Sequence, residues 1–173
     1  MTLMMYGDNA VLFSLHTKFR IYSACAMTVL LYVCETWTLN KRRWAKVQAF
    51  HMQCQHRILS IKWNDFTPNV TEAATSGLDS IINVARRRRL GLFGHVARFS
   101  RDVPASNILA ICCASGDGYP PDSSWKRSSG RPRTTGLDHI SFAPGMSLTY
   151  ALSLTRDRSQ WRAVATAAKA THF

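Results

Sequence analysis

The chain has 173 residues, of which 46 % are hydrophobic, and this apolar content is enough for a core, so wholesale disorder is not the default expectation. Lys and Arg number 22 against 10 Asp and Glu, which gives a formal net charge of +12 at pH 7. The positive charges of such a protein repel one another unless a polyanion is bound. Nucleic acid is the first expected partner, and an anionic membrane is the second.

Two helices are predicted near the N-terminus, because apolar residues recur in steps of three and four. The first covers residues 18–37, and its apolar face comprises Phe19, Tyr22, Ala26, Val29, Val33 and Trp37. The second begins at Asn40, a good N-cap. Its apolar face comprises Trp44, Val47, His51, Cys54, Ile58 and Ile61. The short link between the two helices favours an antiparallel hairpin.

A third long helix is predicted over residues 78–99. Its apolar face comprises Leu78, Ile82, Ala85, Leu92 and Val96. Four consecutive arginines, Arg86 to Arg89, span a full helical turn and cannot share one face. Arg89 falls near the apolar face, so its side chain must snorkel or meet a partner. Gly91 and Gly94 each weaken the helix by roughly 1 kcal/mol relative to Ala, and they permit a close backbone approach or a kink.

The predicted fold is mainly α: a small irregular helical domain with an antiparallel helix hairpin, a third long basic helix, a linker and short C-terminal helices. Residues 1–16 are a tail, 17–101 a basic helical module, 102–136 a short helix followed by a Pro/Gly/Ser-rich basic linker, and 137–173 short C-terminal helices. The shorter predicted helices cover residues 71–77, 105–113, 147–154 and 157–170, and Gly77 is the expected C-cap of the first.

Basic residues are concentrated in windows that contain no acid, between Glu35 and Asp65, between Asp79 and Asp102, and between Asp122 and Asp138. These windows indicate phosphate contacts. The predicted nucleic-acid-binding residues are Arg42, Arg43, Lys46, Arg86, Arg87, Arg88, Arg98, Arg101, Lys126, Arg127, Arg131 and Arg133. Nearby tryptophans, Trp44, Trp63, Trp125 and Trp161, are either an aromatic binding surface or core anchors. For Trp44, which lies on an apolar face, the core interpretation is favoured.

Other functional classes find little support in the residues. His51, Cys54 and His56 lack the spacing of a zinc site, and no C-x-x-C pair or Gly-rich phosphate loop occurs, so we expect no metal, cofactor or small-molecule substrate. The longest uncharged apolar stretch, residues 24–34, is too short to span a bilayer of about 30 Å, so no membrane partner is expected. Without a signal-peptide pattern the expected location is nuclear or cytoplasmic.

Four stretches, in order, resemble the C-terminal region of non-LTR retrotransposon reverse transcriptases. LLYVCETW at residues 30–37 is similar to the family's LLYGCETW, and CQHRILSIKW at 54–63 is similar to a C-x-R-x-I-L-x-I-x-W pattern. RRLGLFGHVAR at 88–98 is similar to RRL-x-x-x-GHV-x-R. GRPR at 130–133, followed by DRSQWR at 157–162, is similar to the family's GRPR and DRSxWR.

The resemblance implies a location downstream of the polymerase, in a helical region that contacts nucleic acid and contributes template or target binding in target-primed reverse transcription. Two-metal polymerase chemistry needs several palm carboxylates. Residues 6–9, YGDN, are similar to a decayed Tyr-x-Asp-Asp motif but offer only Asp8, and they are either a deletion scar or a chance match. The chain is therefore predicted to be non-catalytic.

Departures from the family pattern leave a second hypothesis open. Val33 stands where the family has glycine, Gly136 where it has tryptophan, and residues 141–145 are apolar where a polar helix is expected. These changes suggest a translated transposon relic with no retained function and a marginal helical fold.

Overall fold

The computed structural model describes residues 13–62, 65, 76–119, 122, 124, 130, 136, 137 and 146–167. It confirms the mainly α prediction: the described residues are predominantly helical and form no strand. The chain divides into two compact units. One draws on residues 1–32 and 45–80, and the other on residues 33–44 and 81–173.

The first helix of the first unit contains a turn of π-helix. α1 (Leu15–Ile21), capped by the Ser14 hydroxyl, runs into the π-helical segment Tyr22–Met27 and then into α2 (Thr28–Leu30). The predicted apolar face holds for Phe19 and Tyr22, which are buried. It is wrong for Ala26, Val29 and Val33, which are exposed.

The π-turn explains the error at Ala26 and Val29, whereas Val33 lies beyond the helix, which ends at Leu30 and not at the predicted Trp37. The hydrogen bonds of the π-turn span five residues instead of four, so the turn displaces the inward face by one position. The inward residues after Tyr22 are the half-buried Met27 and then the buried Leu31, a step of five followed by a step of four. A pattern of threes and fours cannot anticipate that single longer step.

Helix α3 (Lys41–Leu59) begins where the sequence predicted. The Asn40 side chain accepts a hydrogen bond from the Arg43 backbone N–H at 3.0 Å, which confirms the N-cap. The predicted apolar face is also confirmed, with two buried and four half-buried side chains: Trp44 and His51, then Val47, Cys54, Ile58 and Ile61.

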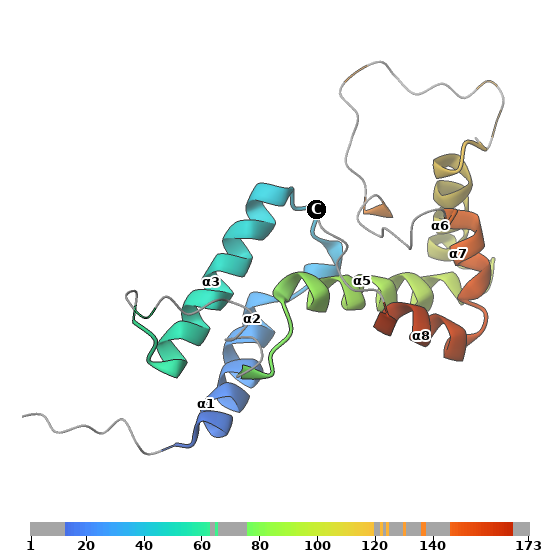
Figure 1. Cartoon of the computed structure of the whole chain (residues 1–173). Helices are drawn as coiled ribbons and strands as arrows, with labels where there is room; N and C mark the ends of the chain where they lie inside the picture. Colours follow the sequence, from blue (N-terminus) through green and yellow to red (C-terminus); the bar gives the residue numbers. More distant parts are fainter. Residues whose placement is uncertain are drawn as a thin grey trace, which may run out of the picture. The chain divides into compact units, whose positions relative to one another are not determined.

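The expected antiparallel hairpin is present in the first unit. α3 runs beside α1 and α2 in the opposite direction (Figure 1). The Tyr22 hydroxyl lies 2.8 Å from His51 Nδ1, and the two rings stack with their centroids 5.7 Å apart. Beyond α3 the chain adopts a left-handed conformation at Ser60, and the Ile61 N–H donates to the His56 carbonyl at 3.0 Å. This is the Schellman pattern of a helix end.

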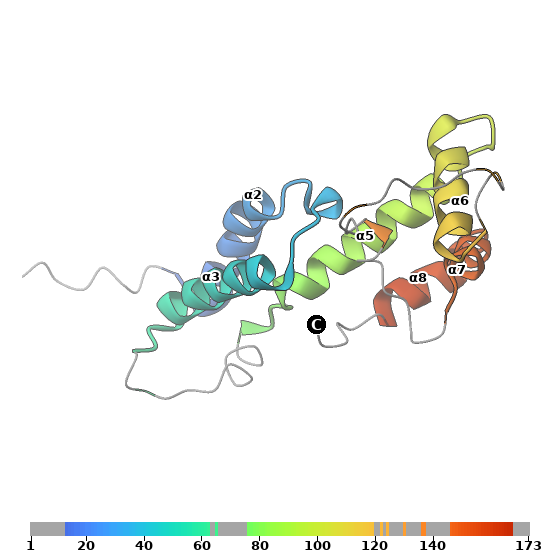
Figure 2. The same ribbon diagram turned by 90° about the horizontal axis from the view of Figure 1, so that it is seen from above.

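The second unit is built on α5 (Ile81–Ala97). A 3-10 turn (Cys34–Thr36) packs against this helix, as do α6 (Pro104–Gly116) and α8 (Arg158–Ala167), while α6 packs on α7 (Leu148–Leu154). Both views show α6 and α7 side by side near one end of α5, with α8 beside α5 (Figures 1 and 2). The predicted helices at 105–113 and 147–154 are thus confirmed, and the one at 157–170 is confirmed as far as Ala167.

The buried face of α5 agrees with the prediction at Ala85, which is buried, but two of its buried residues lie one position away from the predicted ones. Leu92, expected inside, is 40 % exposed, whereas Phe93 is buried, and Ile81 rather than Ile82 is completely covered. Two adjacent rows spaced by four residues face inward, one with Ala85, Arg89 and Phe93 and the other with Arg86, Leu90 and Gly94. Both rows contain an arginine, which an apolar-only pattern passes over.

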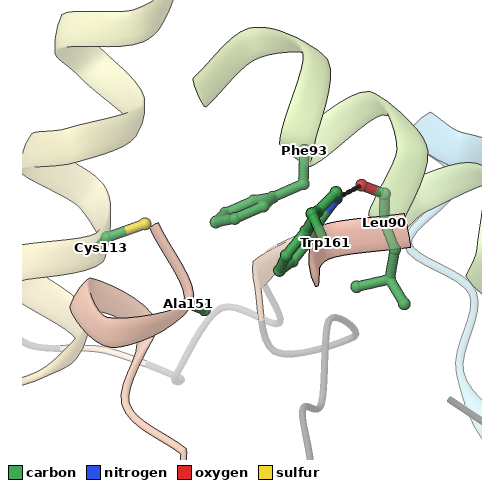
Figure 3. Close-up of a cluster of buried hydrophobic side chains, with 5 residues drawn as sticks. All are labelled: Leu90, Phe93, Cys113, Ala151 and Trp161. Atoms are coloured by element: carbon green, nitrogen blue, oxygen red, sulfur yellow. Dashed lines mark hydrogen bonds between the residues drawn. The ribbon is translucent and has the colours of Figure 1, made fainter. Parts of the chain in front are cut away.

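The core of the second unit gathers around Trp161 (Figure 3). Its indole N–H donates to the Leu90 carbonyl at 2.9 Å, and its ring lies 5.4 Å from that of Phe93. A Cβ added to Gly94 would fall 2.2 Å from Trp161 Nε1, whereas one on Gly91 would meet nothing within 4 Å. The predicted close backbone approach is therefore confirmed at Gly94, where only glycine leaves room for the indole.

A carboxylate joins α6 to α7. Asp117, directly after α6, accepts hydrogen bonds from the Leu148 N–H at 2.9 Å and the Thr149 N–H at 2.8 Å, at the start of α7. The Thr149 hydroxyl also donates to this carboxylate. The hydroxyl bond, and after it the two backbone bonds, lower the pKa of the Asp117 carboxyl. A negative charge at a helix N-terminus is favourable. Asp117 thereby fixes the spacing of the two helices.

Several predictions lie outside the described residues. They include the tail over residues 1–12 with its YGDN stretch, most of the helix at 71–77, Trp63, Trp125 and residues 141–145. Gly77 itself is described, and its φ of +63° is the left-handed conformation expected of a C-cap glycine.

Candidate nucleic-acid interface

The structure places the predicted binding residues in different settings. Arg42, Arg43 and Lys46 are exposed on the first turns of α3. Arg88 and Arg101 are exposed, whereas Arg87 and Arg98 are half-buried. The predicted residues outside the described part of the chain are Lys126, Arg127, Arg131 and Arg133.

Two arginines of the four-residue run face inward. Arg86 is 9 % and Arg89 6 % exposed, and burial lowers the pKa of both guanidinium groups. Arg89 lies over the Trp44 ring at 5.1 Å and donates to the Trp37 carbonyl, so it meets the partner that the sequence required. Trp44, at 2 % exposure, is a core residue as favoured. Little of Arg86 or Arg89 can reach a phosphate.

Arg98 and Arg101, at the far end of α5, lie in a different environment. They line a hollow of about 1030 Å³ together with Arg156 and Arg158, from the connection between α7 and the start of α8. We call this hollow, with its four arginines Arg98, Arg101, Arg156 and Arg158, the arginine hollow. Residues of α6 and α7 complete its wall, and no carboxylate is found among the described residues that line it. Along α5, Arg88 precedes Arg98 by roughly 15 Å at 1.5 Å per residue, so the structure separates the two arginine groups.

A smaller hollow of about 320 Å³ continues the basic surface. Arg98 and Arg158 line both hollows, and the smaller one adds His95 and Arg162. Arg158 and Arg162 are four residues apart on α8, so they lie on one side of that helix. Arg98 is anchored, because its Nη1 donates to the Thr155 carbonyl at 3.3 Å. The positive charge thus forms a strip rather than an isolated spot.

Two acids adjoin this strip in sequence, and both accept hydrogen bonds elsewhere: Asp102, next to Arg101, accepts from the Ser100 hydroxyl at 2.9 Å. Asp157 lies between Arg156 and Arg158, but its carboxylate accepts from the Ser159 N–H at 2.7 Å and the Gln160 N–H at 3.2 Å at the start of α8. Hydrogen bonding from the Ser159 side chain, followed by these backbone bonds, lowers the pKa of Asp157. The carboxylate caps the helix instead of pairing with an arginine of the hollow.

An exposed aromatic side chain stands at the rim. Tyr119, 71 % exposed, lines the arginine hollow just after α6. Its backbone is fixed, because the Tyr119 N–H donates to the Ala114 carbonyl at 2.8 Å and the Gly118 N–H to that of Ser115 at 3.2 Å. Gly118, with a φ of +92°, supplies the left-handed turn. This Schellman motif holds the backbone of an otherwise free ring.

Sequence reasoning missed Arg156, Arg158 and Arg162 as binding residues. They belong to or adjoin the DRSQWR stretch, and two of them share the four-residue helical spacing. The surrounding acid, Asp157, interrupts the charge run, so a search for acid-free windows could not find them. The helical spacing beside a core tryptophan was the available signal.

Other kinds of site find no support in the described residues. They contain no group of three or more His, Cys, Asp or Glu side chains placed to hold a metal ion. Among them, too, no helix is both long and apolar enough to cross a bilayer. Compared with known proteins, the chain matches no family model, no curated protein and no solved structure.

Proposed function

We propose that this chain is a non-catalytic, nucleic-acid-binding fragment of the C-terminal region of a retrotransposon reverse transcriptase, contributing template or target binding in target-primed reverse transcription. The observation that carries the binding role is the arginine hollow, where four arginines from separate parts of the chain line one hollow without a lining carboxylate among the described residues. Clustered arginines of this kind bind phosphates through charge-assisted hydrogen bonds. The net charge of +12 acts in the same direction over longer range.

The proposed parentage is supported by where the family-like residues lie. Gly94 belongs to the GHV stretch and Trp161 to DRSQWR. The Trp161 indole packs against the backbone at Gly94, where no Cβ is in the way. Trp37, the last residue of LLYVCETW, accepts the hydrogen bond of Arg89 in the RRL stretch. Gly94 and Trp161 are therefore residue types that the packing of the second unit requires, and the LLYVCETW and RRL stretches contact each other within the same unit.

The non-catalytic part of the proposal rests on the residues themselves. Two-metal polymerase chemistry needs a set of carboxylates. The YGDN stretch offers Asp8 alone, and the neighbouring sequence supplies no second acid near it. Mg²⁺-dependent primer extension that disappears in Asp8→Ala would contradict this part.

The test is a binding titration at several salt concentrations. A quadruple variant, R98Q/R101Q/R156Q/R158Q, removes the charge of the arginine hollow. Its matched control, R20Q/K41Q/R57Q/K62Q, removes four cations elsewhere. For single strands the slope of log K against log salt should fall by about 0.7 for each phosphate that the variant no longer binds, so we expect a drop of about two to three units in the first variant and a small one in the control. Equal drops in both variants would mean diffuse charge and would refute the site.

A second candidate is a translated relic without function, and Val33 favours it. Val33 adopts φ +54°, a left-handed conformation that is costly for a β-branched residue, at the position where the family motif has glycine. An intact small domain unfolds cooperatively. A broad, non-cooperative melt by circular dichroism would support the relic, whereas a sharp one would count against it.

A further inference from the structure

The shape of the arginine hollow distinguishes between forms of nucleic acid. Duplexes are read by convex elements, such as a helix that enters the major groove. Here the arginines line a concave hollow whose wall also includes residues of α5, α6 and α7. A volume of about 1030 Å³ is at the upper end of what small-ligand pockets enclose, so a few nucleotides of one strand fit where a double helix does not.

The surroundings match the way single strands are held. Proteins that bind a strand without sequence preference combine a positive groove that follows the phosphates with aromatic side chains on which bases stack. The arginine hollow supplies the groove, and Arg162 extends it past Arg98 and Arg158. Tyr119 supplies the aromatic face, because its backbone is fixed by the turn after α6 while its ring is 71 % exposed.

We propose that the arginine hollow binds single-stranded nucleic acid, with phosphates on Arg98, Arg101, Arg156 and Arg158 and a base stacked on Tyr119. This inference rests on the proposed function and specifies its ligand. The Thr155 carbonyl holds one nitrogen of Arg98, so the rest of that guanidinium faces a phosphate without a large loss of side-chain freedom. The strand continues from the larger hollow into the smaller one along Arg158 and Arg162.

The experiment measures fluorescence anisotropy with a labelled single-stranded 12-mer, as RNA and as DNA, and with the matching duplex. The whole chain is compared with Tyr119→Ala and Tyr119→Phe. We expect the single strand to bind more tightly than the duplex, and Tyr119→Ala to weaken single-strand binding by about 5- to 150-fold, the range for loss of one stacked base. Tyr119→Phe retains the ring and the affinity. The salt slope stays unchanged in both variants, because Tyr119 carries no charge.

The outcomes separate this inference from the proposed function. If Tyr119→Ala binds the single strand as tightly as the unmodified chain, or if the duplex binds equally well, the single-strand assignment is overturned while the nucleic-acid role stands. If the arginine-hollow variant behaves like its control, the hollow is not the binding site, and both the single-strand assignment and the site given in the proposed function are overturned. Melting curves of the Tyr119 variants should match that of the unmodified chain, since the exposed ring adds little to folding, and a preserved melt excludes misfolding as the cause of weak binding.

Discussion

The two halves of helix α5 use the same kind of residue in opposite ways. In the first half, Arg86 and Arg89 are buried, and Arg89 serves as a packing group against Trp44. In the second half the interior is apolar, with Leu90 and Phe93 against Trp161, and Arg98 emerges at the end of the helix to line the hollow. An arginine-rich helix is thus not uniformly a binding surface.

The difference also appears in hydrogen bonding. The Trp161 indole N–H has the Leu90 carbonyl as its partner. At the other end, Trp44 Nε1 and Arg89 Nε are buried and have no hydrogen-bond partner among the residues that the structure describes. An unsatisfied buried donor costs about 1–3 kcal/mol. The second half is therefore the better determined of the two, which suits the part that positions the arginine hollow.

Gly94→Ala tests the second half of α5 and should have the largest effect. The new methyl group would fall 2.2 Å from Trp161 Nε1 and must displace the indole, with its bond to Leu90. We expect a loss of about 3 kcal/mol in the free energy of unfolding, measured with urea. Gly91→Ala is the matched control on the same helix, where a Cβ meets nothing within 4 Å. It should stabilise by up to about 1 kcal/mol, and a similar loss in both variants would contradict this account of Gly94.

Arg89→Lys tests the first half. Lysine keeps the charge but loses the planar stacking on Trp44, and it leaves a compact cation in a buried place. The expected loss in unfolding free energy is about 2 kcal/mol. Arg101→Lys, at an exposed position, should change stability by less than about 0.5 kcal/mol. Nucleic-acid affinity should show the opposite order. Arg89→Lys, once folded, should change the affinity little, whereas Arg101→Gln should weaken binding more.

Val33→Gly tests for backbone strain in the segment that packs on the first half of α5. Val33 precedes the Cys34–Thr36 turn with φ +54°. Glycine relieves roughly 1–2 kcal/mol of left-handed strain and gives back part of it through a freer unfolded chain. The net effect should be a gain near 1 kcal/mol, seen as a higher midpoint in thermal unfolding. Val33→Ala, which keeps the strained conformation with a smaller side chain, should gain less.

His51 offers a buried base that, unlike Arg89, can shed its proton. It is fully buried in the first unit, and desolvation lowers its pKa, so the folded state binds a proton more weakly than the unfolded chain does. Its contribution to stability is complete above the ordinary histidine pKa of about 6.5 and is lost as pH falls below that value toward the lower folded pKa. Urea titrations from pH 8 to pH 5 should show this loss, the smallest effect considered.

The control for His51 is Asn, whose side-chain amide can hydrogen-bond the Tyr22 hydroxyl near the place of Nδ1. His51→Asn should flatten the decline between pH 7 and pH 5. An unchanged decline in that variant would assign the acid sensitivity to another group.

The N-cap residue and the spacing of apolar residues predicted correctly those features of the fold that depend on residues nearby in sequence. Asn40 was recognised as an N-cap, and the face from Trp44 to Ile61 was correct, because a regular helix repeats its own geometry. The face after Tyr22 failed because one π-turn inserts an extra residue. The face of α5 failed at Leu92 because the partner that decides it, Trp161, is far away in sequence.

The candidate site was only half predictable for the same reason. Arg98 and Arg101 were identified from local charge, but Arg156 and Arg158 join them through the fold of α7 and α8. Arg89 was correctly expected to need a partner, although only the structure identifies that partner as Trp44 with the Trp37 carbonyl. Charge density can be read along the chain, whereas convergence of charges requires tertiary contacts.

The bond between Trp161 and Leu90 joins residues 71 positions apart. Closing a loop of that length costs roughly 4 kcal/mol of chain entropy, which the small core must offset. During synthesis from the N-terminus, α5 emerges well before its partner, and Arg156 and Arg158 emerge only shortly before Trp161. The arginine hollow therefore assembles only after α7 and α8 have been synthesised, and until then the nascent chain carries the basic residues of α5 without the groove that organises them.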